Sequence, residues 1–522
     1  MKEGIIKKET NNEAEMKENN AEKMELPVVV SQTIERLEKS GFEAYAVGGC
    51  VRDAIRGVEP NDWDITTNAR PEKIMEVFKG RSFLKMSKEK INLGTVCVLS
   101  DSEVPNLKEL EITTYRRDGQ YSDSRRPDSV EFTTSLEEDL KRRDFTVNAM
   151  AFDGKKIIDM FEGQKDLEKK IIRAVGDPKK RFEEDALRLM RAVRFATTLD
   201  FEIEEKTKES LIEMADSIDK ISGERIRDEF LKIIKSKRAN QGILYMKETG
   251  LLKKVLPELL EGEGLDQNKH HVYTVFEHNL RALDYAAESD FNEDVRLAAL
   301  FHDIGKSRTK RGEGMDSTFH SHEIESTNMA YKILKRLKFP NEKIVRITRL
   351  IRYHMFKYDY DPKNPKDETT DSAVKRIIAG VGFENIEDLI SLRMADRIGS
   401  GVAKAHPFRL NRFRYKISKV IKEPISVDQL EINGNDIMRV LKIGEGKRIG
   451  YFKYILFDEV LDKPELNKKD YQLEKIKELN GFSDEELKIK ADKAKDKIYN
   501  VEMEMDDELQ KEHNAKPNIR GI

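Results

Sequence analysis

This sequence has few cysteines and no long apolar run, and both absences limit what the protein can be. Its 522 residues include two cysteines, Cys50 and Cys97, too few for a disulfide framework or a zinc cluster. We expect them to be packing residues in a reduced compartment. No apolar run reaches membrane-spanning length, and the N-terminus lacks the apolar core of a signal peptide. The sequence therefore predicts a cytoplasmic protein with no membrane partner.

An excess of charge of either sign is also absent. Charged residues make up 37% of the chain and hydrophobic residues 38%, and the net charge is −3. With only fourteen prolines, this composition indicates a soluble, helix-rich protein. Contacts with nucleic acid must then come from local basic patches. Candidates are residues 179–181 and 408–416, although the second is equally consistent with an amphipathic helix whose basic face is solvated.

The length predicts several domains, because a single core rarely grows beyond about 250 residues. Short β-branched runs mixed with helical segments predict an α/β head, with strands at residues 44–47, 64–66, 95–99, 110–115 and 130–133. The chain then turns helical, with helices expected at residues 182–197, 226–235, 274–289 and 295–301. From residue 483 it is again highly charged, which predicts a solvated helix followed by a loose end.

The most informative segment follows the first expected strand. The pair Gly48 and Gly49 lets the chain turn and direct N–H groups of the next helix at an anion, and Arg52 is placed to clamp a phosphate. Asp62 and Asp64 are separated by one residue, a spacing that points both carboxylates to the same side of a strand. Two oxygen ligands on one face suit Mg²⁺. Alone, each element is typical of an ordinary turn or strand end, but their order favours a phosphate site beside a metal site.

Further segments continue this pattern in order: LGTV at 93–96, EITTYR at 111–116, YSDSRRP at 121–127, RRDFTVNAM at 142–150 and EDALRLMRAVRF at 184–195. From residue 45 to residue 194 the chain resembles the tRNA nucleotidyltransferase and bacterial poly(A) polymerase family, the class II branch of the polymerase-β-like superfamily. The resemblance implies an α/β nucleotidyltransferase head with a mixed sheet, followed by an all-α neck, an HD body and a tail.

Nucleotidyl transfer needs an activated 3′-hydroxyl, an electrophilic phosphorus and a neutralised pyrophosphate. Two divalent ions held by carboxylates supply all three. We assign Asp62 and Asp64 as bridging ligands of Mg²⁺. The resemblance makes Glu111 the third catalytic carboxylate, which deprotonates the hydroxyl or holds the first metal ion. The alternative is a solvent-facing residue at a sheet edge.

The resemblance also implies which residues bind the nucleotide. Asp185 and Arg188 are three residues apart on a helical run, so they share a face. A carboxylate beside a guanidinium can hydrogen-bond the pairing edge of cytosine or adenine, so that protein side chains replace a template. A simple intrahelical ion pair is the alternative. By the same likeness, further contacts with the nucleotide come from Gly49, Arg52, Arg143, Asp144, Arg191 and Arg194.

A second constellation begins at His278 and continues with the HDIGK segment of His302 and Asp303. It resembles an HD-domain phosphohydrolase, in which imidazoles and carboxylates bind one or two divalent ions that activate water. The resemblance implies a divalent transition metal (Mn, Ni, Co or Fe), held by His278, His302, Asp303 and Asp396, with His322 and His354 completing a second site. The other histidines are interpreted as ordinary surface or core residues.

Residues 430–437 and 446–450 resemble the C-terminal segment of HD-bearing CCA-adding enzymes. We therefore predict these parts of the chain: a disordered tail (1–26), the nucleotidyltransferase head (27–153), a helical neck that recognises the base (154–268), an HD phosphohydrolase domain (269–400), a tRNA-binding tail (401–482) and a charged extension (483–522).

The function implied is addition or repair of the 3′-terminal CCA of tRNA from CTP and ATP, with an additional phosphohydrolase activity. One alternative is a poly(A) polymerase or a partial enzyme that adds only CC or only A. Residues 84–98 carry no arginine-rich signature of the poly(A) branch, which disfavours that option. Another is an HD phosphohydrolase whose head merely binds RNA, and a third is a non-catalytic RNA-binding scaffold. The presence of both Asp62 and Asp64 argues against an inactive head.

Overall fold

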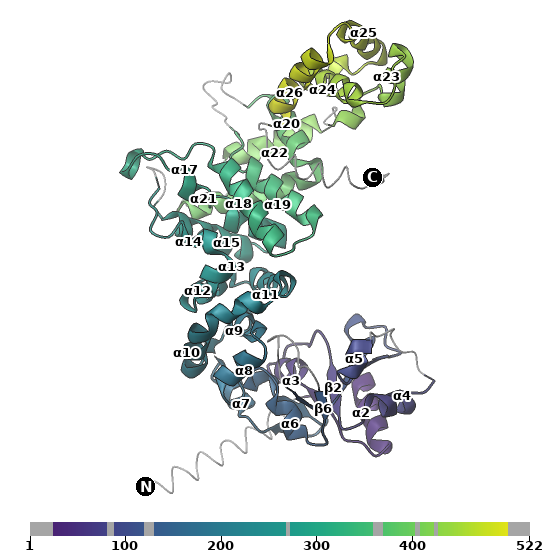
Figure 1. Ribbon diagram of the computed structural model, residues 1–522, viewed down its shortest axis with the longest axis vertical. Coiled ribbons are helices and arrows are strands. Elements are labelled where there is room, and N and C mark those ends of the chain that lie inside the picture. The colour runs from purple at the N-terminus through teal and green to yellow at the C-terminus, as the bar shows by residue number, and fades with distance from the viewer. Residues whose placement is uncertain are drawn as a thin grey trace. The chain divides into compact units, whose positions relative to one another are not determined.

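The computed structural model describes residues 24–80, 88–119, 130–267, 272–358, 369–401, 408–421 and 426–499. The chain divides into two compact units, Met1–Val255 and Leu256–Ile522 (Figure 1). Among the described residues, no helix has both the length and the apolar character needed to cross a membrane. Several predictions fall outside the described residues: the tail before residue 24, the segment 121–127, residues 500–522, and His270, His271, His406 and His513.

A six-stranded sheet forms the centre of the head, with the strand order β3-β4-β2-β1-β7-β8. Its strands are β1 (Ala44–Val47), β2 (Asp64–Thr67), β3 (Thr95–Leu99), β4 (Glu109–Thr114), β7 (Met150–Phe152) and β8 (Ile157–Asp159). Strands β2 and β4 run parallel and the other neighbours antiparallel, so the sheet is mixed, as predicted. The strand expected at 130–133 is β6 (Val130–Phe132), which pairs with β5 (Arg116–Asp118) in a separate sheet.

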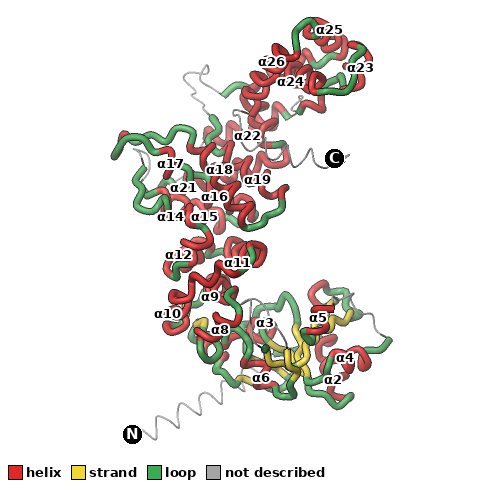
Figure 2. The backbone as a smooth tube through the Cα atoms, viewed as in Figure 1, coloured by secondary structure: helices red, strands yellow, loops and turns green. Residues whose placement is uncertain are grey.

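Helices cover the sheet with apolar stripes. Helix α2 (Val28–Lys39) buries Val30, Ile34 and Leu37, spaced so that they lie on one face. It contacts β1 and α4 (Pro71–Val77), and α4 contacts β3 and β4. Helix α3 (Gly49–Ile55) lies against β1 and β7. The strands of the head are surrounded by these helices in Figure 2.

The rest of the first unit is mainly helical. Its helices are α6 (Leu136–Lys141), α7 (Gly163–Glu168), α8 (Pro178–Glu184), α9 (Leu187–Leu199), α10 (Glu205–Met214), α11 (Gly223–Lys235), α12 (Ala239–Glu248) and α13 (Leu251–Val255). The single helix predicted over 182–197 is wrong. Asp185 has an extended backbone, with φ −140° and ψ 104°, and separates α8 from α9. Its carboxylate accepts the N–H of Leu187 at 3.0 Å, and a side chain that bonds a backbone N–H in this way favours a helix start.

The described residues of the second unit form helices and turns without a strand (Figure 2). The helices of its first part are α14 (Pro257–Leu260), α15 (Val275–Glu288), α16 (Glu293–Phe301), α17 (Lys306–Thr309), α18 (His322–Arg336), α19 (Asn341–Tyr353), α20 (Asp371–Val381), α21 (Ile386–Gly399) and α22 (Phe408–Val420). Helix α15 begins with a capping box in which Thr274 and Glu277 bond each other's backbone N–H groups. The helices predicted at 274–289 and 295–301 are confirmed as α15 and α16.

One apolar core is shared by the four C-terminal helices α23 (Gly434–Leu441), α24 (Lys447–Asp462), α25 (Lys469–Leu479) and α26 (Asp484–Tyr499). Leu487 of α26 is buried in that core with Phe452 and Leu456 of α24. The expectation of a solvated helix after residue 483 is therefore wrong for one face of α26, because Leu487, Ala491 and Ala494 are buried. The boundary predicted at residue 482 cuts through this core. The other domain boundaries stay predictions.

Candidate active sites

Three carboxylates lie close together at the parallel pair β2 and β4. Asp64 is paired with Glu111 in the strand register, so both side chains leave the same face of the sheet, and Asp62 precedes Asp64 by two residues. Burial and the charges of Asp62 and Glu111 raise the pKa of Asp64 to about 6, although the charge of Arg143 opposes this. A divalent cation would relieve this repulsion. The three oxygen donors therefore fit a metal ion such as Mg²⁺.

Glu111 does not lie at a sheet edge, because β4 is placed between β3 and β2. Its side chain is 45% exposed and forms an ion pair with Lys90 at 3.0 Å. Among the described residues, sets of three or more candidate ligand atoms within 4.8 Å of one another occur only in the second unit. The three head carboxylates are neighbours that do not converge this tightly.

The guanidinium of Arg143 lies over the turn at Gly48. Gly48 has a φ of +86°, and a Cβ atom there would stand 2.8 Å from Arg143 Nη1. Both the backbone conformation and this close approach require glycine. The Nε of Arg143 is buried and has no hydrogen-bond partner among the described residues. The charge of Arg143 also acts on Asp64, and the contact of Arg143 with the nucleotide stays a prediction.

Arg52, which follows Gly49 in α3, is engaged by protein groups. Its Nε and Nη2 donate to the two oxygens of Asp53 at 2.9 and 2.6 Å, and its Nη1 donates to Asn148 Oδ1 at 2.6 Å. Only 8% of the residue is exposed. Arg52 thus joins α3 to the segment before β7. Contact of Gly49 or Arg52 with a phosphate stays a prediction.

Asp144 and Arg191 form a buried ion pair. Asp144 Oδ2 accepts from Arg191 Nε at 2.7 Å, while Oδ1 accepts from the N–H of Phe145 at 2.8 Å and from Asn148 Nδ2 at 3.1 Å. Burial would raise the pKa of Asp144, but the Arg191 charge and the Asn148 hydrogen bond hold it well below its ordinary value. Both oxygens of Asp144 thus bind protein groups, and its contact with the nucleotide stays a prediction.

The side chains of Asp185 and Arg188 are not paired with each other. Asp185 Oδ2 accepts from Arg225 Nη2 at 2.8 Å, and Arg188 donates to Glu184 Oε2 at 2.5 Å and to the carbonyl of Arg142 at 2.9 Å. The prediction of a shared helical face is wrong because the chain is extended at Asp185. The alternative prediction, an intrahelical ion pair between Asp185 and Arg188, is wrong for the same reason.

Helix α11 supplies partners for two of the predicted site residues, and the sequence analysis missed both partners. Arg225 holds Asp185, and Glu229 Oε2 accepts from Arg194 Nε at 2.8 Å. The Arg194 guanidinium also lies 3.6 Å from the centre of the Phe195 ring. Both α11 residues are at least 35 positions from their partners, so no local spacing pattern signals them.

Four buried side chains of the second unit converge on one point. The ligand atoms of His278, His302, Asp303 and Asp396 lie within 4.8 Å of one another. His278 Nε2 is 2.9 Å from His302 Nε2 and 3.0 Å from Asp303 Oδ2. Burial would lower the pKa of His278, but hydrogen bonds with Asp303 and Asp396 raise it to about 9. A metal ion would displace this proton on binding.

A second group joins Asp303 to His322 and His354, again within 4.8 Å. Asp303 Oδ1 lies 3.2 Å from His322 Nε2 and 3.6 Å from His354 Nε2, yet these buried atoms have no hydrogen-bond partner among the described residues. In His302, His322 and His354 the Nδ1 atom is 2.7–2.8 Å from a backbone carbonyl, which leaves Nε2 to face the cluster. These donors fit divalent transition metals.

The sequence analysis also missed two cations beside these carboxylates. Lys306 Nζ is buried, 2.6 Å from Asp303 Oδ2 and 2.7 Å from Gln267 Oε1, and Arg393 Nη1 lies 2.7 Å from Asp396 Oδ2. The two cations offset the two carboxylates, so bound divalent ions would leave the site positive. A phosphoryl anion would balance that charge. Lys306 follows Asp303 by three residues, a spacing that could have signalled this contact.

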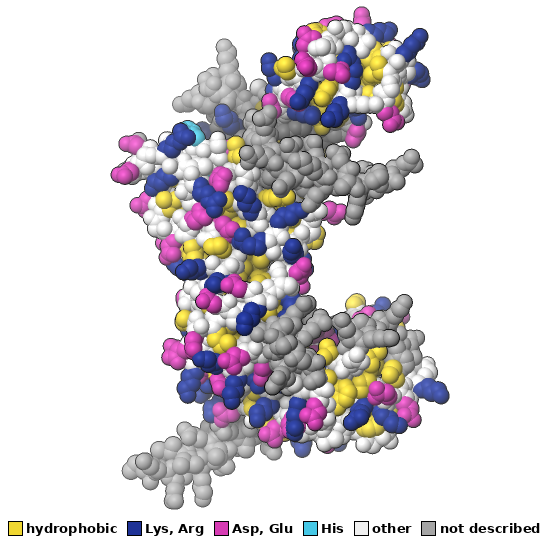
Figure 3. Space-filling model, viewed as in Figure 1, with side chains coloured by type: hydrophobic (Ala, Val, Ile, Leu, Met, Phe, Trp, Pro, Cys, Tyr) yellow, Lys and Arg dark blue, Asp and Glu magenta, His cyan; other side chains and the backbone are white. Residues whose placement is uncertain are grey.

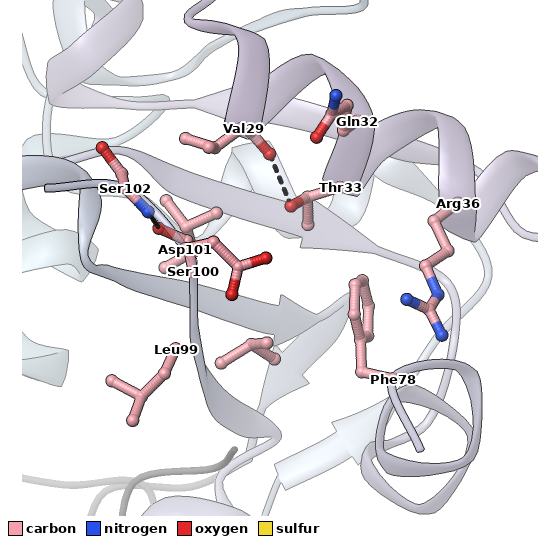
Figure 4. A pocket seen from close by; sticks show the side chains of 11 residues that line it. Val29, Gln32, Thr33, Arg36, Phe78, Leu99, Ser100, Asp101 and Ser102 are labelled. Atoms are coloured by element: carbon pink, nitrogen blue, oxygen red, sulfur yellow. Dashed lines mark hydrogen bonds between the residues drawn. The ribbon is translucent and has the colours of Figure 1, made fainter. Parts of the chain in front are cut away.

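The remaining surfaces give weaker signals. A small pocket beside α2 (Figure 4) contains none of the predicted site residues; it is lined by Val29, Gln32, Thr33, Arg36, Phe78, Val98, Leu99, Ser100, Asp101, Ser102 and Leu110. On the visible face, basic and acidic side chains are interspersed (Figure 3). Helix α22 is amphipathic, with Leu410, Phe413 and Ile417 buried and Tyr415 57% exposed, and its contact with RNA stays a prediction.

Comparison with known proteins matches three parts of the chain to described families. Residues 44–173 match the Poly A polymerase head domain, residues 200–262 the probable RNA and SrmB-binding site of polymerase A, and residues 275–379 the HD domain. The resemblance found in the motifs is thereby confirmed.

Two curated relatives are similar to part of the chain. The CCA-adding enzyme of Ligilactobacillus salivarius (strain UCC118) is 47% identical over 221 residues, 42% of this chain and 52% of that protein. The CCA-adding enzyme of Enterococcus faecalis (strain ATCC 700802 / V583) is 46% identical over 234 residues, 44% of this chain and 55% of that protein. The chain thus spans about half the length of these relatives.

Solved structures extend the similarity. A Bacillus stearothermophilus CCA-adding enzyme in complex with CTP has a TM-score of 0.62 and 26% identity, over 87% of this chain and 98% of that chain. A Thermotoga maritima CCA-adding enzyme complexed with tRNA has a TM-score of 0.50 and 20% identity, over 86% of this chain and 93% of that chain. It shares the fold. A polymerase-β-like head followed by a helical body with an HD domain is therefore the architecture of this chain.

Proposed function

We propose that this chain, which carries a Poly A polymerase head and an HD domain, adds or repairs the 3′-terminal CCA of tRNA from CTP and ATP without a nucleic-acid template. The observation that carries the proposal is the pair Asp64 and Glu111 beside Arg143, because it joins acidic metal donors to a nearby cation. The similarity to CCA-adding enzymes, one of them solved with CTP, supports it.

Asp62, Asp64 and Glu111 would hold the divalent ions, and their oxygen donors favour Mg²⁺. Such ions, when bound in a pair, activate the hydroxyl, polarise the phosphorus and neutralise pyrophosphate. The positive charge of Arg143 would attract the triphosphate, and Gly48 has no side chain to obstruct the approach of its Nη1 to the turn. Glu111, which shares a face with Asp64, would accept the proton of the tRNA 3′-hydroxyl or hold an ion.

Base selection is proposed for Asp185 and Arg188. The carboxylate accepts hydrogen bonds and the guanidinium donates them, so together they suit the pairing edges of cytosine and adenine. Each is oriented by the protein, Asp185 by Arg225 and Arg188 by Glu184. A fixed geometry at these two groups would reject uracil and guanine, whose donors and acceptors are differently arranged.

Replacement of Asp185 by Asn or of Arg188 by Lys should relax discrimination against UTP and GTP more than it weakens triphosphate binding. Loss of one good base contact should cost about 1–3 kcal/mol of discrimination. Arg225→Gln should have the same effect in weaker form, because it releases Asp185. The measurement is misincorporation of each nucleotide at the 3′ end, with Arg173→Gln as a control, since Arg173 pairs with Asp166 instead. An equal loss of incorporation for all four nucleotides would contradict the assignment.

For the HD site we propose metal-dependent hydrolysis of 2′,3′-cyclic phosphodiesters or of phosphomonoesters. The two groups that share Asp303 would hold one or two divalent transition metal ions (Mn, Ni, Co or Fe). A bound ion of this kind lowers the pKa of water and so supplies a nucleophile. Lys306, which Asp303 and Gln267 orient, would neutralise charge on the phosphoryl group.

One experiment tests the main proposal and its alternatives. The purified protein is incubated with tRNAs ending before CCA, after C and after CC, and each nucleoside triphosphate is offered separately. Addition of two C residues with CTP and of one A with ATP supports the proposal. Long A tails indicate a poly(A) polymerase, and addition of C alone or of A alone indicates a partial enzyme. If no nucleotide is added, the remaining alternatives are the HD hydrolase and the RNA-binding scaffold. We also propose a cytoplasmic location, with which the free cysteines Cys50 and Cys97 are consistent.

A further inference from the structure

We propose that Asp139 is a positioning residue of the nucleotide site, which holds the guanidinium of Arg143 over the Gly48 turn. The inference rests on the proposed nucleotidyl transfer, because it concerns how that site holds a triphosphate. Asp139 lies on α6, belongs to none of the ligand sets above and is 0% exposed. A fully buried carboxylate is costly unless it is paired, so its partners indicate what it does.

The two oxygens of Asp139 have different partners. Oδ1 accepts from Arg142 Nε at 2.9 Å and Nη2 at 2.7 Å. Oδ2 accepts from Thr66 Oγ1 at 3.1 Å and lies 3.5 Å from Arg143 Nη2. Thr66 is two residues after Asp64 on β2, so its side chain shares the face of that carboxylate. Asp139 therefore ties Arg143 to the strand that carries Asp64.

The charges around Asp139 do not cancel. One carboxylate faces two guanidiniums, and although burial would raise its pKa, Arg142 and Arg143 hold it below the ordinary value. Asp139 therefore does not neutralise both guanidiniums. Arg143 Nη1 approaches the Gly48 turn, the Arg143 charge also acts on Asp64, and its buried Nε has no hydrogen-bond partner among the described residues. Asp139 thus occupies one edge of the guanidinium and leaves the rest to an anionic ligand. The triphosphate is that ligand in the proposed reaction.

The same segment reaches the groups proposed to read the base. The carbonyl of Lys141 accepts from Arg181 at 3.1 Å and that of Arg142 accepts from Arg188 at 2.9 Å. These contacts are made by backbone oxygens and do not involve the Asp139 carboxylate. Loss of the carboxylate should therefore weaken all nucleoside triphosphates alike, whereas loss of Asp185 or Arg188 should change their ranking.

The test compares Asp139→Asn with Asp166→Asn. Asp166 is a matched control, because it is also buried and accepts from a threonine, Thr146 at 2.7 Å, and an arginine, Arg173 at 3.0 Å, without touching Arg143. Binding of ATP and CTP with Mg²⁺ is measured by equilibrium dialysis on the full chain. Asp139→Asn should weaken both nucleotides about tenfold to a hundredfold, the loss expected for a charge-assisted contact. KM should rise similarly, with kcat nearly unchanged, and Asp166→Asn should leave both values unaltered.

A double variant decides whether Asp139 acts through Arg143. In an Arg143→Ala background, Asp139→Asn should weaken nucleotide binding no further. A full additional loss there, or an equal loss in Asp166→Asn, would overturn the proposal. If Asp139→Asn does not fold, Thr66→Val removes one partner of the carboxylate and should weaken binding, while Thr66→Ser should restore it. Wild-type protein that binds both nucleotides yet adds none to tRNA would refute the proposed function and leave this test intact.

Discussion

Replacing Asp64 by Asn is expected to abolish nucleotide addition and, at the same time, to stabilise the metal-free protein. The first effect follows from loss of a proposed metal ligand, and addition should fall about a thousandfold or more, as when one member of a catalytic set is removed. Binding of tRNA should survive, because the carboxylate serves the metal and not the RNA. Addition assays at saturating Mg²⁺ and tRNA binding by gel shift measure the two quantities.

The second effect follows from the raised pKa of Asp64, about 6 in the folded chain against an ordinary value of 3.8. A group shifted in this direction contributes stability below pH 3.8 and loses it as the pH rises through about 6. Above that pH the charge opposes folding, so Asp64→Asn should raise the free energy of unfolding by about 1–3 kcal/mol. Urea unfolding in EDTA at pH 5 and pH 8 should show the gain mainly at pH 8.

Glu109→Gln is a suitable control, since Glu109 lies on β4, is exposed, and was assigned no role. It should change neither addition nor stability. Persistent CCA addition by Asp64→Asn would contradict the metal assignment. Destabilisation by that variant at pH 8 would contradict the electrostatic argument.

Replacing His302 and Asp303 together by Ala should remove the HD metal and any phosphohydrolase activity while CCA addition survives. The reason is that the two ligand sets belong to different units of the chain, with Asp64 in the first and His302 in the second. Metal content of protein purified without chelator is measured by mass spectrometry. Hydrolysis of 2′,3′-cyclic AMP and of p-nitrophenyl phosphate is measured with Mn²⁺, Ni²⁺ or Co²⁺.

Bound metal contributes folding free energy, so a melting curve must accompany these assays. His320→Ala controls for loss of a histidine, because His320 is exposed and lies outside both ligand groups. The assignment fails if the wild-type protein contains no transition metal and hydrolyses neither substrate. Loss of CCA addition in a variant that melts normally would show that the two activities are not separable.

Local patterns were sufficient to predict four of the six strands of the head sheet, but not β7 or β8. The strand beginning at Asp64 is indicated by the alternation of its side chains, and the turn at Gly48 is indicated by glycine. Both signals come from adjacent residues. The neighbours His302 and Asp303 were also predicted from the sequence, because HDIGK places them at the end of an apolar helix. In both cases the short spacing that carries the chemistry also fixes the geometry.

Long-range partners account for what the sequence did not predict. The run around Asp185 has strong helix formers, and the break there is accompanied by an ion pair with Arg225, 40 positions later. Arg52 and Asp144 were predicted to face a nucleotide, but Asn148 and Arg191 engage them in this structure. The sequence pattern gives residue types along one element and does not identify which residue of another element will meet them.

Helix α26 shows that a high density of charge does not make a segment dispensable. Its buried residues Leu487, Ala491 and Ala494 lie along one stripe at intervals of four and three, and Leu487 belongs to the core that the C-terminal helices share. A protein shortened to residue 482 would expose Phe452 and Leu456 to water. Such a truncation would favour aggregation. In the intact chain, limited proteolysis is expected to spare helix α26, because Leu487, Ala491 and Ala494 are buried.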